Sequence, residues 1–248
     1  MKKKSLVIFT SLVLCILLVI PVIAVPPAPN IETASTWARD DISLAVYLGL
    51  VPQELQSDYS AATTRAEFAA LAVALYENLI GYVEGRITFV DTSDVNVEKM
   101  AYLGVVQGVG RNQFAPEQPI TREAAAVFLT RLYVAMGYPL SQQTPTFEDN
   151  YDIASWAMEG VGHMQATGIM GGVSSSRFAP KSPYTLQQSI ITMLRMFNII
   201  TEARANDESE PTPTPEPTLE PTPTPTPEPE PTPESTPAPT PTPVPPGD

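Results

Sequence analysis

Two arginines occupy the second position of a recurring sequence, and their surroundings suit the binding of an anion. The first copy is TRAEFAALAVALY at residues 64–76 and the second is TREAAAVFLTRLY at 121–133, so Arg65 and Arg122 fall in the first turn of a predicted helix. There a guanidinium stands beside backbone N–H groups without intrahelical partners, at the positive end of the helix dipole. Together these groups form a cradle for a carboxylate, the alternative being an ordinary solvated charge.

Aromatic and glycine residues could complete such a binding site. Trp37 and Trp156 offer flat aromatic faces to a ligand, although side chains of this size are also expected as wedges in a core. Gly108 and Gly172 lie in predicted loops, where the lack of a Cβ lets the backbone approach a ligand closely. The candidate ligand-binding residues are therefore Arg65, Arg122, Trp37, Trp156, Gly108 and Gly172.

The chain carries no motif that indicates catalysis. His163 is the single histidine and is expected in a groove or on the surface, and no G-x-S-x-G elbow, H-E-x-x-H or phosphate loop occurs. Asp91–Asp94 and Asp149–Asp152 offer oxygen ligands without the spacing of an EF-hand, and Asp91 and Asp149 are expected to cap or orient the turn that follows. We expect no enzyme, no cofactor and no metal.

Residues 1–24 have the pattern of a signal peptide. Three early lysines precede an apolar run that Pro21 interrupts, and small Ala24 marks the expected cleavage site. The alternative is a retained membrane anchor, because the run is long for a signal peptide. Cleavage would remove the one cysteine, Cys15, and three of 14 basic residues, leaving a formal net charge of −16. Such a chain is expected to be secreted and to bind neither nucleic acid nor, after cleavage, membrane.

The last 44 or so residues read as a spacer, because from Ala205 proline, threonine and glutamate replace the apolar residues. Repeated proline predicts a disordered or polyproline II tail, reaching roughly 110 Å at 3.1 Å per residue. The fold is therefore expected within 25–204.

This central part contains three repeats, at about 31–85, 86–140 and 141–204. Gly49, Gly104 and Gly168 each follow a short apolar period and are expected at the left-handed position that ends a short helix. Phe114 and Phe178 follow ten residues after the second and third glycines, and threonines come seven residues later. Tyr59 is expected at the same place in the first repeat, although Thr64 comes only five residues after it.

Each repeat then opens a long amphipathic helix at a threonine cap. Thr64 and Glu67 form a capping box, and Thr185 with Gln188 has the same pattern. Thr121 keeps the cap, while its acid moves one place earlier to Glu123, where it can complement the helix dipole. Three such helices, each with one apolar stripe, predict an all-α fold of helix-loop-helix repeats with pseudo-threefold symmetry around a central three-helix bundle.

The tryptophan-bearing short helix, the G-I/V-V/M segment, the glycine loop, F-A-P and T-R-A-E together resemble the S-layer homology family over about residues 31–204. The resemblance implies a three-pronged helical domain that holds exported proteins to the bacterial cell wall. It also implies a partner, an anionic secondary cell-wall polysaccharide that often carries pyruvate ketals, bound in grooves between repeats with help from Arg65 and Arg122. The third repeat departs from the pattern because Leu186 replaces the arginine.

Two functions from different classes follow from these observations. The first is a non-catalytic module that anchors the chain at the bacterial cell wall or S-layer surface by binding the polysaccharide. The alternative is a set of degenerate repeats that act as a structural domain and bind other envelope proteins without binding polysaccharide.

Overall fold

The computed structural model describes residues 25–140 and 142–209. The expected signal peptide and residues 210–248 of the expected spacer lie outside these ranges. Contacts divide the chain into Met1–Asp207 and Glu208–Asp248, and the fold described here is that of the first unit. No helix in the described ranges combines the length and apolar character that crossing a membrane requires.

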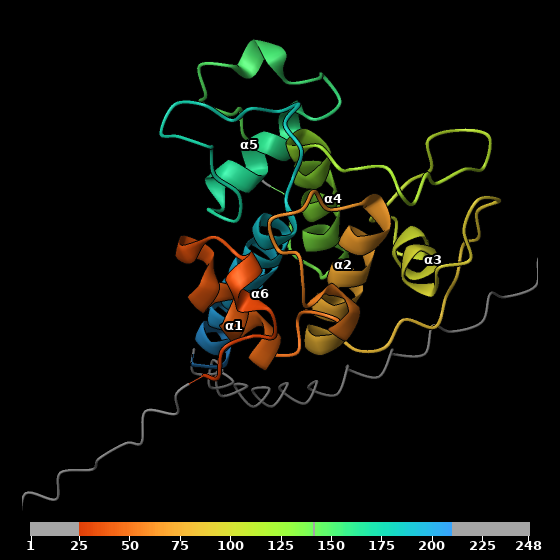
Figure 1. Cartoon of the computed structure of the whole chain (residues 1–248). Helices are drawn as coiled ribbons and strands as arrows, with labels where there is room; N and C mark the ends of the chain where they lie inside the picture. Colours follow the sequence, from red (N-terminus) through yellow and green to blue (C-terminus); the bar gives the residue numbers. More distant parts are fainter. Residues whose placement is uncertain (1–24, 141, 210–248) are drawn as a thin grey trace, which may run out of the picture. The chain divides into compact units, whose positions relative to one another are not determined.

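Six α-helices alternate between short and long in the described residues. Figure 1 shows the long helices α2, α4 and α6 in the middle, with the short helices α1, α3 and α5 around them. Within 25–140 and 142–209 there is no strand, and isolated bridges link the loops. The prediction of an all-α fold is confirmed. The helices are α1 (Arg39–Tyr47), α2 (Arg65–Leu79), α3 (Val95–Tyr102), α4 (Arg122–Ala135), α5 (Met158–Ala166) and α6 (Leu186–Ser209), with 3-10 turns η1 (Ile31–Thr33), η2 (Thr36–Ala38), η3 (Gln53–Leu55) and η4 (Asn150–Asp152).

The three short helices end at the predicted glycines. Gly49, Gly104 and Gly168 have φ of +74°, +72° and +73°, a left-handed backbone that residues with a Cβ rarely adopt. After the first two, the amides of Leu50 and Val105 reach back to carbonyls inside the helix, which closes its last turn. The apolar residues that follow each glycine are buried, so these segments fix the short helices to the core.

The long helices begin at the predicted threonine caps. In α2, the hydroxyl of Thr64 accepts the amide of Glu67, and the Glu67 carboxylate accepts the amide of Thr64, which completes the capping box. In α6 the box is half formed, because Gln188 accepts the Thr185 amide while the buried Thr185 hydroxyl has no partner among the described residues. The predicted stripes of α2, α4 and α6 line the core, where the rings of Phe68 and Phe128 lie 6.0 Å apart.

A closed ring of backbone hydrogen bonds marks the pseudo-threefold centre. The amide of Thr63 donates to the carbonyl of Tyr184, that of Tyr184 to Ile120, and that of Ile120 back to Thr63, at 2.8, 2.9 and 2.9 Å. These three residues hold the same place, directly before each helix-capping threonine. The first and third repeats are therefore joined in the same way as consecutive ones.

The register assigned to Tyr59 is wrong by two residues. The residues with left-handed backbone are Asp58, Ala115 and Ala179, with φ of 49°, 59° and 58°, and each lies six residues before its capping threonine. Tyr59 therefore corresponds to the proline of F-A-P rather than to the phenylalanine. The two residues missing from the first repeat lie upstream, between Gly49 and Asp58, where no aromatic residue marks the register.

Helix α6 continues to Ser209, five residues past the point at which the composition indicated the spacer. Arg204, directly before these five residues, donates from Nη1 to the carbonyl of Leu79 at the end of α2, which attaches this part of α6 to the core.

Candidate functional site

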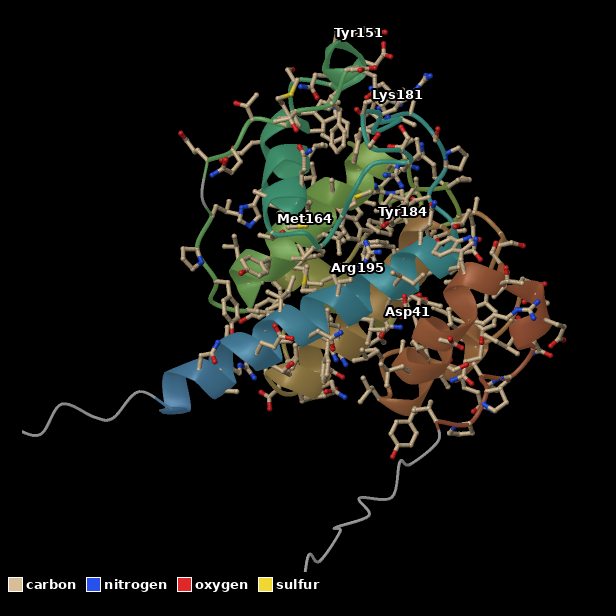
Figure 2. The ribbon with its side chains drawn as sticks, turned by 90° about the vertical axis from the view of Figure 1, so that its left-hand side faces the viewer. Asp41, Tyr151, Met164, Lys181, Tyr184 and Arg195 are labelled. Atoms are coloured by element: carbon tan, nitrogen blue, oxygen red, sulfur yellow. The ribbon has the colours of Figure 1, made fainter. Side chains whose placement is uncertain are left out.

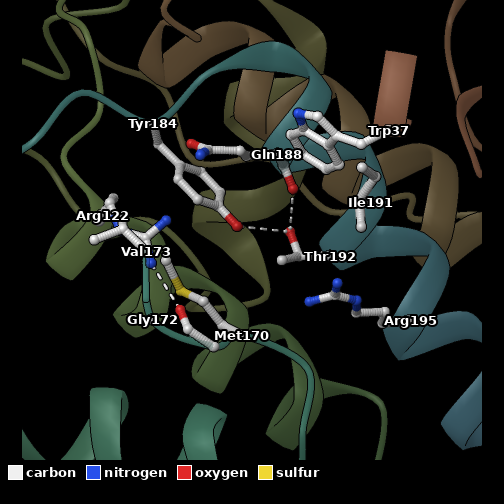
Figure 3. A pocket seen from close by; sticks show the side chains of 11 residues that line it. Trp37, Arg122, Met170, Gly172, Val173, Tyr184, Gln188, Ile191, Thr192 and Arg195 are labelled. Atoms are coloured by element: carbon white, nitrogen blue, oxygen red, sulfur yellow. Dashed lines mark hydrogen bonds between the residues drawn. The ribbon is translucent and has the colours of Figure 1, made fainter. Parts of the chain in front are cut away.

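The largest of the three equivalent pockets between repeats lies beside Trp37, and we call it the Trp37 groove. It encloses about 380 Å³ where the N-terminal half of α6 meets the first turn of α4 and the glycine loop of the third repeat. Figure 3 shows Arg122 and Arg195 on opposite sides of it, with Tyr184 and Thr192 between them. Its lining is Trp37, Arg122, Met170, Gly171, Gly172, Val173, Tyr184, Gln188, Ile191, Thr192 and Arg195.

The second pocket, the Trp156 groove, repeats this arrangement one repeat earlier in the chain. It encloses about 290 Å³ and brings Arg65 and Trp156 together at the first turn of α4. Its lining differs from that of the Trp37 groove in charge, because it has one arginine in place of two and includes the carboxylate of Glu123. The lining residues are Arg65, Val109, Gln118, Pro119, Ile120, Thr121, Glu123, Ala124 and Trp156.

The third pocket, the Leu186 groove, lies at the equivalent place between repeats but has neither an arginine nor a tryptophan in its lining. It encloses about 160 Å³, with Leu186 at the arginine position and no tryptophan in its lining. Three carboxylates face it, which makes it unsuited to an anion. Its lining is Glu54, Leu55, Ser57, Asp58, Ala61, Ala62, Glu67 and Leu186.

The two candidate arginines are held by backbone carbonyl groups of the neighbouring repeat. Arg122 donates from Nε to the carbonyl of Phe178 at 2.8 Å and from Nη2 to that of Gly171 at 2.7 Å. Arg65 makes the same pair of bonds, both at 2.8 Å, to Phe114 and Gln107. Each guanidinium also lies over two aromatic rings, which adds cation–π attraction.

Both arginines are therefore structural groups as well as lining residues. Arg65 is 9% exposed and Arg122 is 4% exposed. Burial lowers the pKa of each guanidinium, and nearby Asp91 for Arg65, and Tyr184 and Asp149 for Arg122, oppose that shift. Arginine stays charged at neutral pH even so. The alternative of a freely solvated charge is wrong for both.

The proposed cradle of free helix amides is also wrong. The first two amides of α2, those of Arg65 and Ala66, donate to Gln118 and Pro116 of the next repeat. Those of α4 donate to Ser182 and Pro180 in the same way, and those of α6 donate to loop carbonyls of the first repeat. Carbonyl groups of the neighbouring loop accept these amides at the start of each helix. An anion in a groove can therefore be bound only by side chains.

The tryptophans lie at the grooves rather than in the core. Trp37 is 61% exposed and Trp156 is 60% exposed, so the expectation that they are core wedges is wrong. The second residue of the adjacent helix holds each segment: Gln187 accepts the amide of Ser35 at 3.0 Å. Glu123 accepts the amide of Ala154 at 2.9 Å, which explains why the acid of α4 has moved to that position.

The candidate glycines are required by backbone packing. A Cβ on Gly172 would lie 2.5 Å from the carbonyl oxygens of Arg177 and Ser174. One on Gly108 would lie 2.6 Å from the carbonyl oxygen of Gln113. Gly172 lines the Trp37 groove, whereas Gly108 is absent from the lining of the Trp156 groove. Their small size thus shapes the loops, and the approach of a ligand at either glycine stays a prediction.

Asp91 and Asp149 bind the F-A-P loops instead of capping the turn that follows them. The carboxylate of Asp149 accepts the amides of Phe178 and Ala179, both at 2.8 Å, and Asp91 accepts those of Phe114 and Ala115. Burial would raise the pKa of Asp149, but these amides and Arg177 outweigh it and lower the pKa. In the described ranges no group of three or more potential ligands could hold a metal.

Residue-level reasoning from the sequence missed Arg195. Arg195 is the tenth residue of α6, and it corresponds to Arg131 in α4 and Ala74 in α2. Figure 2 shows Arg195 on the face of α6 that is turned to the viewer, near Tyr184. The signal was present in TMLRMF, which has an arginine in the third helix about two and a half turns after Leu186, the position where the first arginine is lost. His163, by contrast, is buried against Tyr133 and lines none of the three grooves.

Comparison with known families gives this geometry a context. Residues 96–126 match the family model described as the S-layer homology domain. The match lies within the second repeat and runs from α3 through the glycine loop into the first turn of α4, so it includes Arg122. An S-layer homology domain is therefore present, and it implies anchoring and a location at the cell envelope.

Two curated proteins are similar over a longer stretch. An amylopullulanase of Thermoanaerobacterium thermosulfurigenes is 29% identical over 161 residues, which is 62% of this chain and 9% of that protein. Exoglucanase XynX of Acetivibrio thermocellus is 30% identical over 157 residues, which is 60% of this chain and 14% of that protein. The chain thus spans a small fraction of the length of these relatives.

Proposed function

We propose that residues 25–204 form a non-catalytic module that holds a secreted chain to the cell wall by binding an anionic secondary polysaccharide. Sugar acids or pyruvate ketals would supply the negative charge. The family match supports attachment at the envelope. That the attachment is through a polysaccharide is our proposal.

One observation carries the proposal: the Trp37 groove concentrates positive charge in an acidic chain. The whole sequence has a formal net charge of −13, yet this lining has two arginines and no carboxylate. Trp37 stands exposed beside them, so its face is available to a sugar ring while a guanidinium binds an acidic substituent.

The other two grooves differ in how well they suit the same ligand. The Trp156 groove keeps the tryptophan and the arginine, so it is a second candidate, with Glu123 opposing an anion. The Leu186 groove has neither residue and three acids, so it is expected to stay empty of polysaccharide. We therefore propose one or two working grooves rather than three.

Retention on purified walls tests this function. The full chain is mixed with peptidoglycan that carries its polysaccharide and, separately, with peptidoglycan from which the polysaccharide has been removed. We expect retention on the first and none on the second. Equal retention on both, or none on either, would refute polysaccharide binding and favour an envelope domain that binds other proteins.

A further inference from the structure

Arg195 is the one arginine of the Trp37 groove whose donors are unoccupied. It is exposed and lines the pocket on α6, and within residues 25–140 and 142–209 its guanidinium has no hydrogen bond or ion pair. Asp41 lies below it in the view of Figure 2, but Asp41 is absent from the pocket lining. All the N–H groups of Arg195 are thus available to a ligand.

Arg122 is less available on the opposite side of the same groove. Its Nε and Nη2 already donate to Phe178 and Gly171, and its side chain is almost fully buried. A ligand can use only what remains of this guanidinium, and it cannot move toward the ligand without breaking those bonds. Arg122 therefore contributes a fixed charge at the back of the groove.

The corresponding position reaches a groove in one case out of three. Arg131, the tenth residue of α4, is absent from the lining of the Trp156 groove, and burial lowers its pKa. In α2 that position is Ala74. The Trp156 groove also contains Glu123, whose carboxylate would repel an acid. The charged residues in the linings thus distinguish the Trp37 groove from the Trp156 groove, whereas the T-R sequence is common to both.

We infer that Arg195 is the specificity-determining contact for the acidic group of the polysaccharide, and that the Trp37 groove alone recognises that group. This inference rests on the proposed function. The guanidinium of Arg195 binds the carboxylate of the sugar acid or ketal, the sugar ring lies on Trp37, and Arg122 adds attraction from the opposite side. In the Trp156 groove a sugar ring can then bind on the face of Trp156, but the groove does not distinguish acidic sugars from neutral ones.

Calorimetric titration of the full chain with the polysaccharide released from purified walls tests the inference. A second preparation of the polymer has its carboxylates reduced to alcohols, which removes the charge and keeps the sugars. The variant is Arg195→Gln, and the matched control is Arg131→Gln, which removes the same charge from the same position of α4. The sequence has two tryptophans, one in the Trp37 groove and one in the Trp156 groove, so the fluorescence of a Trp156→Phe chain reports on the Trp37 groove.

We expect Arg195→Gln to weaken binding of the native polymer by about tenfold or more, because a charge-assisted hydrogen bond is lost. The reduced polymer should bind the unaltered chain about as weakly as the native polymer binds Arg195→Gln. The substitution should not weaken binding of the reduced polymer any further. Arg131→Gln should bind as the unaltered chain does. Circular dichroism should show that the exposed substitution leaves the fold intact.

Each other result separates the two proposals. If the unaltered chain binds neither polymer, the proposed function fails, and this inference fails with it. If the chain binds and Arg195→Gln keeps full affinity and full preference for the native polymer, the inference is overturned and the proposed function stands. Equal losses in Arg195→Gln and Arg131→Gln would also overturn it, because the effect would then be one of net charge.

Discussion

Arg122 donates from Nε to the carbonyl oxygen of Phe178 at 2.8 Å, and its Cζ lies 4.9 Å from the centre of the ring of the same residue. Arg65 stands in the same relation to Phe114, at 2.8 and 4.4 Å. One side chain therefore fixes both the backbone and the ring of the F-A-P loop in the next repeat. Any account of these arginines as ligand contacts has to include that structural role.

Arg122→Ala is expected to lower the free energy of unfolding by about 2–4 kcal/mol, because it leaves buried carbonyl groups without donors and removes packing against the ring. Urea unfolding followed by circular dichroism measures this. Arg195→Ala, an exposed substitution in the same groove, is the control and should change stability by less than about 0.5 kcal/mol. If both variants unfold at the same urea concentration, the structural role is wrong.

Gly172→Ala and Gly171→Ala form a matched pair in one loop. The first should cost about 1–3 kcal/mol, because a Cβ would lie 2.5 Å from two backbone oxygens and the loop would have to shift. The second has no atom within 4 Å of the added Cβ and should be nearly neutral. Thermal unfolding of the two variants measures the difference, and equal melting temperatures would contradict the packing described here.

Glu123→Gln should be tolerated better than Glu123→Ala. Glutamine already serves at the corresponding position of α6, where Gln187 accepts the amide of Ser35. Alanine would leave the Ala154 amide without its acceptor, at a cost of about 1–3 kcal/mol. The ion pair with Lys181 is lost in both variants and contributes little, because Lys181 is largely exposed.

The readouts for this pair are urea unfolding and acrylamide quenching of Trp156 in a Trp37→Phe chain. Glu123→Ala should make the segment before Trp156 more mobile, which changes the quenching, while Glu123→Gln keeps it. The same stability and quenching in both variants would show that Glu123 does not position this segment.

Acid should destabilise the fold through Asp91 and Asp149. The amide of Phe114 lowers the pKa of Asp91, and the amides of Phe178 and Ala179 outweigh burial to lower that of Asp149, each below the ordinary value of 3.8. A carboxylate whose folded pKa is lowered contributes stability above its unfolded pKa. That contribution is lost as the pH falls below about 3.8 and through the folded pKa.

Asp149→Asn should therefore reduce stability at pH 7 and flatten the dependence of stability on pH between pH 5 and pH 2. Urea midpoints across that range test the prediction, with Asp152→Asn in the neighbouring turn as control. An unchanged slope in Asp149→Asn would show that this carboxylate is not a source of the acid sensitivity.

Local signals in the sequence were sufficient for the helices. Threonine caps, the three left-handed glycines and the apolar stripes are short-range features, and the structure has them where they were predicted, except that the Thr185 hydroxyl before α6 accepts no amide. The register of Tyr59 was not predictable in this way, because the shortened segment removes the phenylalanine that marks the loop in the other repeats. Because the pattern was based on residue type, Tyr59, the nearest aromatic residue, was matched to the missing phenylalanine.

The candidate site was predicted less completely, because its chemistry depends on contacts between repeats. Sequence spacing brought Arg65 and Arg122 to helix starts, but it could not reveal that loops of the next repeat occupy the helix amides and two donors of each guanidinium. Nor could it distinguish Arg195, which faces a groove, from Arg131, which does not. Those differences arise from three-dimensional packing around the shared axis.

The hydrogen-bonded ring of Thr63, Ile120 and Tyr184 also limits how such a domain can grow. An open stack of repeats can gain or lose a unit at either end, since each unit contacts only its neighbours. Here the last unit is bonded back to the first, so a shortened chain would lose two junctions and an added unit would find no vacant one. Three is thus a closed number for this architecture, and what distinguishes its three junctions from one another is the set of residues that lines each groove.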